Sequence, residues 1–512
     1  MSSILLFSFV IGYFLLLLVV AYYTSRNSNN DSFFIGNRNS NWMLVAFGMV
    51  GTSLSGVTFV SVPGTVGDYT AGTFKAFGYF QVVIGYFIGY FVIAFVLLPL
   101  YYKMNLTSIY NYLQNRFGNI SYKTGALFFI ISRTVGATAR LYLVIFVLQE
   151  FILESIGIPF IVTAFIILLM ILLYTFEGGV KTIVYTDTLQ TTFMLLGLIV
   201  CVVYILSSLD LSLGAAMQTL SDKGYTQIFN TDIKSGGFFL KQIVGGMFIT
   251  IAMTGLDQEM MQKNISVKTL KNSQKNMMTF NVIIVIVNFL FLLLGGLLYL
   301  YMLNQGAEYQ QVATPDGATK WAFLSNNENI IGDRLFPSVA LQLFPQAIAI
   351  IFIIALISAL FPSADGALTA LTSSFCIDIL GVKRREDLTE AQRKKIRLTV
   401  HLSFAVIFMI CILIFHQIAS RSIIDKILDL AGYTYGPLLG LFAFGILTTR
   451  KLPETYLVVA ICLVAPVLCF FLKVNAMDWF NGYQIGIELL LINGLLTFLG
   501  LLTISKKPEP VN

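Results

Sequence analysis

Long apolar runs separated by short polar segments form the dominant pattern of this chain from one end to the other. A helix needs about 20 mostly apolar residues to cross the hydrocarbon core of a bilayer. The pattern therefore predicts an all-α polytopic membrane protein, with about thirteen transmembrane helices in a single domain over residues 1–512. The expected spans are 4–23, 42–66, 74–102, 121–149, 157–176, 181–206, 240–260, 278–302, 337–379, 397–418, 422–448, 453–472 and 482–503.

The basic residues alternate from one loop to the next. If the N-terminus faces outside, the cytoplasmic loops hold 21 of the 32 Lys and Arg, including Lys263, Lys268, Lys271, Lys275 and the run 383–397. Cytoplasmic loops of membrane proteins carry such an excess of positive charge. We therefore expect a multi-pass protein of the plasma membrane (the inner membrane in a bacterium), with its N-terminus outside and its C-terminus inside.

Composition excludes other classes of protein. Hydrophobic residues make up 57% of the 512 residues and charged residues 11%, whereas a soluble protein has about 25% charged residues. Five cysteines are too few for a disulfide scaffold. The net charge of +6 sits in short loops, so the expected partner is the lipid bilayer and not a nucleic acid. The first run has no basic region before it and no small-residue cleavage site, so we expect a retained helix.

Two predicted spans contain residues that weaken a helix. The span 42–66 includes FGMVGTSLSGVTFVSVPG, and the span 240–260 includes GGMFITIAMTGLDQ. In a bilayer, a helix breaks only where protein or a water-filled cavity satisfies its backbone. Two interrupted segments at matching places in two halves indicate the central site of a transporter. Close helix packing through small residues is the alternative.

Among the ionisable residues within predicted spans are Asp187, Asp365, Arg133 and Arg140. Such residues are costly in a membrane, so each is a functional candidate. A hard cation such as Na⁺ prefers several oxygen ligands, which the carboxylates and the nearby hydroxyls supply. The two arginines are seven residues apart and share a helix face, and a guanidinium suits a planar carboxylate. An internal ion pair of either arginine with Asp187 or Asp365 is the alternative.

Several stretches resemble the sodium/solute symporter family, which includes sugar, proline and sialic acid transporters. They are GGVKTIVYTDTLQTTFMLLG (178–197), TGLDQEMMQKNISVKTLKNSQK (254–275), ALISALFPSADGALTALTSSFCIDIL (355–380) and AGYTYGPLLGLFAFGIL (431–447). The resemblance covers about residues 5–500. It implies the LeuT-type fold, with inverted five-helix repeats at about 42–206 and 240–448, a helix at 4–23 before them and extra helices at about 453–503.

The resemblance also implies a main sodium site. It places the carbonyls of Gly51, Leu54 and Ala359 and the hydroxyl of Ser363 around the ion. The family usually has two adjacent hydroxyl residues where this chain has Pro362 and Ser363. Proline has no hydroxyl and frees a carbonyl one turn earlier. That carbonyl could replace the lost ligand, or the site could be weaker.

A second cation site is found in some members near the aspartate that corresponds to Asp187. Its remaining ligands fall near Asp365 and Gly366. Two carboxylates at one place favour a second cation, or a shared proton when no cation is bound.

The solute site follows less firmly from the resemblance. Arg140 lies 47 residues before Asp187, the position of an arginine that holds the substrate carboxylate in the sialic acid members. Sugar members have a neutral amide there. Backbone hydrogen bonding is the alternative role for the hydroxyls of the first broken span. The solute-binding candidates are Ser53, Ser55, Thr58, Phe77, Gln81, Arg140, Asp257 and Asp429.

The resulting hypothesis is a sodium-coupled secondary symporter. It would import a small polar organic solute, a carboxylate such as a sugar acid or sialic acid, by alternating access, as a monomer, with Na⁺ as coupling ion and no cofactor. A symporter of a neutral sugar or polyol is one alternative, and a transporter-like membrane sensor without transport is another. An enzyme is not expected, because the chain has only two histidines, His401 and His416, and no catalytic motif.

Overall fold

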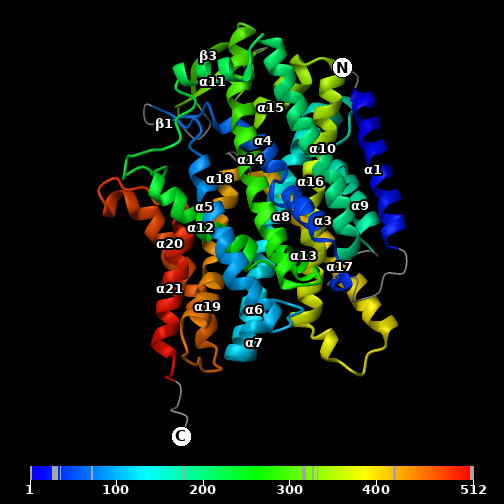
Figure 1. Cartoon of the computed structure of the whole chain (residues 1–512), viewed down its shortest axis with the longest axis vertical. Coiled ribbons are helices and arrows are strands. Elements are labelled where there is room, and N and C mark those ends of the chain that lie inside the picture. The colour runs from blue at the N-terminus through cyan, green and yellow to red at the C-terminus, as the bar shows by residue number, and fades with distance from the viewer. Residues whose placement is uncertain are drawn as a thin grey trace.

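The computed structural model describes residues 3–25, 33–34, 36–70, 73–176, 179–313, 319–325, 328–330, 332–418 and 423–507. Within these ranges the chain forms a bundle whose long helices run roughly side by side, as Figure 1 shows. In this described part, eight helical segments are long and apolar enough to cross a membrane. They comprise α1 (Ser3–Ser25), α5 and α6 (Phe80–Val92 and Leu98–Lys103), α8 (Asn119–Leu148), α10 (Gly179–Ser208), α14 (Leu270–Asn304), α16 (Gln346–Ser374), α17 (Glu390–Ile418) and α20 (Leu457–Trp479).

Two further spans are broken, as the sequence predicts. Helices α3 (Trp42–Ser53) and α4 (Gly56–Thr65) meet at a bend of 55°. Helices α12 (Phe239–Thr250) and α13 (Gln258–Ile265) are joined by a looser turn and meet at a bend of 64°.

Each break has a local cause in the sequence. At the first, Leu54 leaves helical geometry between two serines. At the second, Asp257 adopts an extended conformation, and its carboxylate accepts hydrogen bonds from the backbone N–H groups of Glu259 and Met260. An aspartate in this position satisfies the free donors of a new helix, so it starts α13.

Several predicted spans are shorter or divided. The span expected at 337–379 begins as α15 (Leu335–Ser338) and restarts after Pro345 as α16. The span expected at 422–448 consists of α18 (Ile423–Thr434) and α19 (Gly436–Leu447), and Pro437 lies in the first turn of α19, where its missing N–H is tolerated. The remaining short helices are α7 (Asn111–Phe117), α9 (Phe160–Thr175), α11 (Leu213–Asp222) and α21 (Leu489–Ile504).

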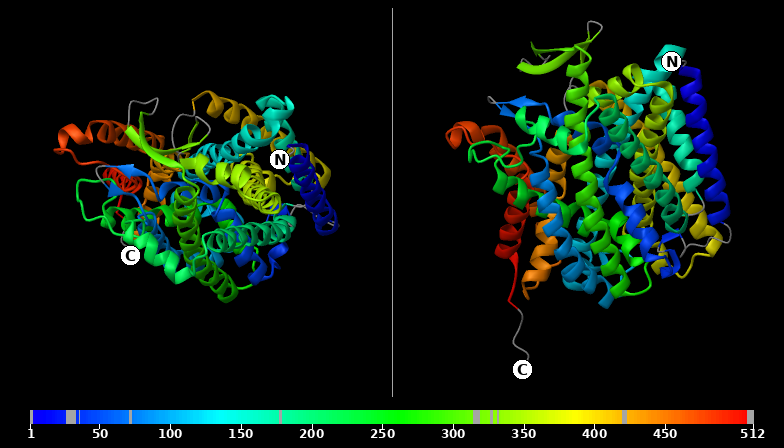
Figure 2. Two further views of the ribbon diagram at one scale, coloured as in Figure 1. Left: turned by 90° about the horizontal axis from the view of Figure 1, so that it is seen from above. Right: turned by 45° about the horizontal axis from the view of Figure 1, so that its top comes forward.

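A small antiparallel sheet caps one end of the bundle, between the expected spans 278–302 and 337–379. Its strands are β3 (Glu308–Ala313), β4 (Thr319–Ser325) and β5 (Glu328–Ile330). Figure 2 shows the sheet above the helices. Phe323 of β4 packs on Tyr309 and Tyr299, so aromatic contacts anchor the sheet to α14. A two-stranded ribbon, β1 (Tyr69–Thr70) with β2 (Thr73–Phe74), follows α4.

Burial separates the inner helices from the outer ones. Helix α16 is buried along most of its length and packs against α8 and α10. In Figure 2, α1 and α20 lie at opposite edges of the bundle. Helix α20 exposes Leu463, Val467 and Phe471, and an exposed apolar face of this kind is typical of a surface that contacts lipid.

Candidate solute and cation site

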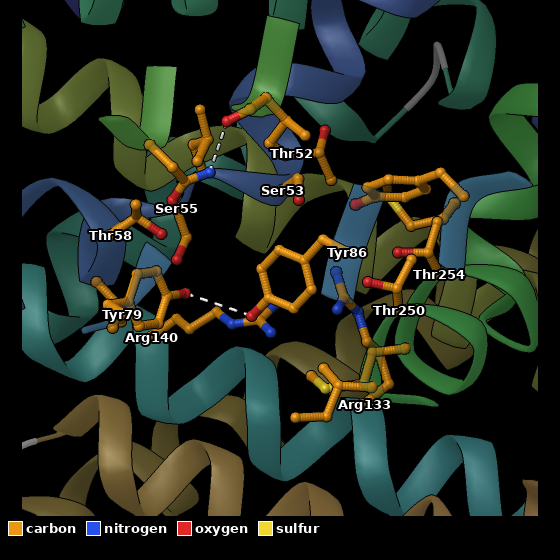
Figure 3. Close-up of a pocket in the computed structure, with 18 residues that line it drawn as sticks. Thr52, Ser53, Ser55, Thr58, Tyr79, Tyr86, Arg133, Arg140, Thr250 and Thr254 are labelled. Atoms are coloured by element: carbon orange, nitrogen blue, oxygen red, sulfur yellow. Dashed lines mark hydrogen bonds between the residues drawn. The ribbon is translucent and has the colours of Figure 1, made fainter. Parts of the chain in front are cut away.

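A cavity of about 100 Å³ lies where the two broken helices face each other. One buried water needs roughly 10–15 Å³ by this kind of measure, so the cavity has room for a small polar solute. Hydroxyl groups and two arginines make its wall polar, as Figure 3 shows. The polar lining residues are Thr52, Ser53, Ser55, Thr58, Tyr79, Tyr86, Tyr90, Arg133, Arg140, Thr250, Thr254 and Asn288.

The first break supplies several of these hydroxyls. Ser55 stands at the start of α4 but makes no side-chain capping bond there, and its side chain lines the cavity together with that of Thr58. Thr52 behaves differently, since its hydroxyl lies 3.3 Å from the carbonyl of Gly48 and 3.2 Å from the carboxylate of Asp187. Backbone satisfaction is therefore one role of Thr52, while Ser55 presents its hydroxyl to the cavity.

Arg140 has no ion-pair or hydrogen-bond partner for its guanidinium among the described residues. It lines the main cavity and a smaller pocket beside Tyr435. Figure 3 shows it next to Tyr79 and Tyr86, whose hydroxyls lie 3.3 Å apart. A partly buried cation without a counterion is unfavourable inside a membrane. The geometry therefore leaves Arg140 available to an anionic ligand.

Arg133 is paired. Its guanidinium donates a hydrogen bond to Glu259 and lies 3.9 Å from the carboxylate of Asp257. The alternative from the sequence, an internal ion pair, therefore holds for Arg133, but the predicted partners Asp187 and Asp365 were wrong, because Asp257 and Glu259 at the start of α13 supply the carboxylates. Asp257 is completely buried, caps α13 and accepts a hydrogen bond from Tyr435 at 3.0 Å.

Four of the eight predicted solute-binding residues line the cavity: Ser53, Ser55, Thr58 and Arg140. Their binding role stays a prediction. Asp257 does not line it, because its carboxylate is used by α13 and Tyr435. Asp429 lies on an exposed part of α18 and pairs with Lys473 at 2.5 Å.

The two residues predicted from the span 74–102 also lie elsewhere. Phe77 is buried against Phe289. The amide of Gln81 donates to the carbonyl of Gly78 at 2.9 Å and accepts from the backbone of Asn230 at 3.3 Å. The structure places Tyr79 and Tyr86 in the wall instead. Their seven-residue spacing was the available signal, since it puts two polar aromatic residues on one helix face.

The predicted main sodium ligands lie on two segments that touch. The N–H of Gly51 donates to the hydroxyl of Thr191 at 3.1 Å, and a Cβ at Gly51 would lie 2.3 Å from that oxygen and 3.5 Å from a ring carbon of Pro362. Only glycine allows this approach of α3 to α10 and α16. Leu54 is in the cavity wall. Ala359 and Ser363 are buried, and the Ser363 hydroxyl donates to the carbonyl of Leu360 at 3.0 Å. Their role as ligands stays a prediction.

The predicted second cation site contains a residue that the sequence analysis had put elsewhere. The ammonium nitrogen of Lys263 lies 2.6 Å from the carboxylate of Asp187 and 2.6 Å from the hydroxyl of Thr52. The assignment of Lys263 to a cytoplasmic loop was wrong, because α13 continues to Ile265 and keeps Lys263 97% buried. Its four-residue spacing from Glu259, at 3.7 Å, was the available signal.

The other two members of the predicted second site lie close by. Asp365 accepts a hydrogen bond from Tyr174 at 2.7 Å. A Cβ at Gly366 would lie 2.3 Å from a carboxylate oxygen of Glu259, so α13 approaches α16 at this point. The structure thus gathers Asp187, Asp365 and Gly366 around a buried lysine.

Comparison with known proteins decides the family. The model of the sodium:solute symporter family matches residues 33–454. The chain belongs to this family. Among curated proteins, it is 24% identical over 485 residues to the sodium/sialic acid symporter NanT of Aliivibrio fischeri, covering 91% of this chain and 87% of that protein. It is 24% identical over 435 residues to the sodium/sialic acid symporter SiaT of Proteus mirabilis, covering 82% and 79%.

The fold of this symporter-family chain also matches solved structures. A Na⁺-coupled sialic acid symporter in its substrate-bound, outward-open state superposes with a TM-score of 0.80 at 19% identity, covering 98% of both chains. This agreement confirms the expected all-α transporter fold. The chain is therefore a multi-pass membrane protein of a transporter family.

Proposed function

We propose that this family member is a sodium-coupled symporter that imports a small organic acid, a sugar acid such as sialic acid, by alternating access. The guanidinium of Arg140, which has no partner among the residues that the structure describes, lies at the wall of the central cavity and carries the proposal. A guanidinium can grip a carboxylate with two parallel hydrogen bonds. The names of the two relatives that match most of the chain, both sodium/sialic acid symporters, support the same class of solute.

The rest of the cavity wall suits a solute with several hydroxyl groups. Ser55 and Thr58 lie on one side, and Thr250 and Thr254 of α12 and its extension on another. Hydroxyls can donate and accept hydrogen bonds with sugar hydroxyls. A neutral sugar would use these groups but would leave Arg140 without a counter-charge, so the structure favours the acid.

Sodium coupling follows from the position of the proposed main ion site. We assign it to Gly51, Leu54, Ala359, Pro362 and Ser363. Leu54 lies both in this set and in the cavity wall, so ion and solute would stabilise the same geometry of the first broken helix. Two ligands that favour one conformation raise each other's affinity, and this linkage is reciprocal. A downhill flow of Na⁺ can then drive accumulation of the solute.

The topology of thirteen spans, with the N-terminus outside and two inverted repeats, is part of this proposal. Each proposed repeat begins with a bent helix, α3–α4 in one and α12–α13 in the other. Helix α1 begins at one end of the bundle and α21 ends at the opposite end (Figure 1), as an odd number of spans requires. The membrane would be the plasma membrane.

Uptake of radiolabelled sialic acid into proteoliposomes, with and without an inward Na⁺ gradient, tests the function. We expect Na⁺-dependent accumulation that falls at least tenfold in Arg140→Gln, because one charged, bidentate contact is lost. Arg385→Gln is the matched control, since Arg385 is exposed and pairs with Asp387 at the surface. It should transport like the wild type. If the protein accumulates a neutral sugar and this uptake survives Arg140→Gln, the proposal that the solute is an organic acid is wrong. If no solute is taken up in response to a Na⁺ gradient, the alternative of a membrane sensor without transport is favoured.

A further inference from the structure

Lys263 lies against Asp187, at the position where the sequence analysis predicted a second cation site. Its ammonium group touches the carboxylate of Asp187 on α10 and the hydroxyl of Thr52 at the end of α3, at 2.6 Å in each case. A carboxylate of Glu259 lies 3.7 Å away. Oxygen ligands from a carboxylate and a hydroxyl are those that a hard cation prefers. The lysine nitrogen therefore takes the contacts that a bound ion would take.

Asp187 has little capacity left for another cation. One of its oxygens is in contact with Lys263 and Thr52. The amide nitrogen of Gln190, in the orientation that satisfies its neighbours, donates to the other oxygen at 3.3 Å. Both oxygens are thus engaged, and Asp187 is 99% buried. A sodium ion could bind at Asp187 only by displacing the ammonium group.

The charge balance of the region explains why the lysine is held there. Three buried carboxylates are paired with two buried cations. Burying a charge without a partner costs several kcal/mol in a protein interior, so the removal of either cation leaves a strongly anionic pocket. The carboxylates belong to Asp187, Asp257 and Glu259, and the cations are Arg133 and Lys263.

We propose that the ammonium group of Lys263 is a tethered replacement for the second transported cation, so that each solute is coupled to one Na⁺. The inference rests on the proposed sodium-coupled function. A lysine fixed to α13 holds the end of α3 without leaving the protein during the cycle. It keeps the two broken helices joined while contributing nothing to the ion gradient that drives uptake. The second site is therefore latent, and shortening Lys263 would open it to Na⁺.

A sodium titration of the purified full-length protein tests the latent site without a solute. We would measure thermal unfolding in detergent as Na⁺ replaces K⁺ at constant ionic strength. The wild type should follow a single-site curve, whereas Lys263→Ala should show a larger Na⁺-dependent rise in melting temperature with a Hill coefficient above 1.5. Lys263→Arg, which keeps the charge, and Lys268→Ala, which changes an exposed lysine just beyond α13, should behave like the wild type. Identical curves for Lys263→Ala and the wild type would overturn the proposal.

The transport stoichiometry of the wild type gives an independent test that does not depend on the folding of a variant. In proteoliposomes clamped at zero membrane potential, the sialic acid gradient that just stops net flux should equal the first power of the Na⁺ gradient. A second-power dependence would show two transported ions and would refute the role of Lys263 while leaving the symporter intact. A solute flux that no Na⁺ gradient can reverse would instead refute the sodium coupling itself, and the inference with it.

Discussion

Arg133 and Arg140 stand two turns apart on the same helix, yet the structure gives them opposite surroundings. Arg133 meets Glu259 and Asp257 at the start of α13 and is 97% buried. Arg140 faces the cavity beside Tyr79 and Tyr86, with no ion-pair partner in the described part of the chain. The same residue type on the same helix is therefore paired with carboxylates at one position and lines the cavity at the other.

The difference arises from where α13 begins. Because Asp257 breaks the helix and starts α13, two carboxylates are delivered to the level of Arg133 and none to the level of Arg140. A paired buried charge stabilises one arrangement of helices, whereas an unpaired buried charge can bind a ligand of opposite charge. We therefore expect the paired Arg133 to have a structural role and Arg140 to have the binding role proposed above.

The largest expected effect is that of Arg133→Gln. The change would leave Glu259 and Asp257 buried with one counter-charge fewer, and breaking a buried pair costs about 3–5 kcal/mol. We expect a sharp fall in the melting temperature of the purified protein and in its yield from the membrane. A melting temperature within a degree of the wild type would show that the pair is not structural, and the contrast with Arg140 would fail.

Arg140→Lys should have an intermediate effect of a different kind. It keeps the positive charge but loses the planar fork that holds a carboxylate at two points. Loss of one charged hydrogen bond corresponds to about 1.5–3 kcal/mol, so we expect the KM for sialic acid to rise roughly 10- to 100-fold with an unchanged melting temperature. A fall in melting temperature as large as that of Arg133→Gln would place Arg140 in the scaffold too.

These two arginines also show which features of the site could be predicted from the sequence and which could not. Local patterns predicted the positions of the broken helices, because glycine, serine and Asp257 act on their own segments. The prediction that Arg140 lies at the solute site came from the resemblance to known transporters. The partners of Arg133 could not be predicted from the sequence, because they depend on how α13 packs against α8. A local sequence pattern carries no information about this packing.

Lys263 and Gln81 are two residues whose surroundings were predicted wrongly from the sequence. A lysine just beyond an apolar run fits the charge bias of a cytoplasmic loop, and only the continuation of α13 carries Lys263 into the interior. Gln81 was predicted to face the solute, but the loop at Asn230 folds back and uses its amide. In both cases a contact between distant segments decides the role of the side chain.

The smallest predicted effect concerns the wall opposite Arg140. Ser55→Ala removes one hydroxyl that makes no capping bond at the start of α4, so α4 should be as stable as before. If the hydroxyl meets the solute, its loss should cost about 0.5–1.5 kcal/mol, which corresponds to a 2- to 10-fold rise in KM. Ser403→Ala is the matched control, because the Ser403 hydroxyl is exposed on α17 and bonds to the backbone of its own helix at 2.9 Å. An equal KM in the two variants would confine solute recognition to the arginine side of the cavity, and an effect on the melting temperature alone would assign Ser55 to the broken helix.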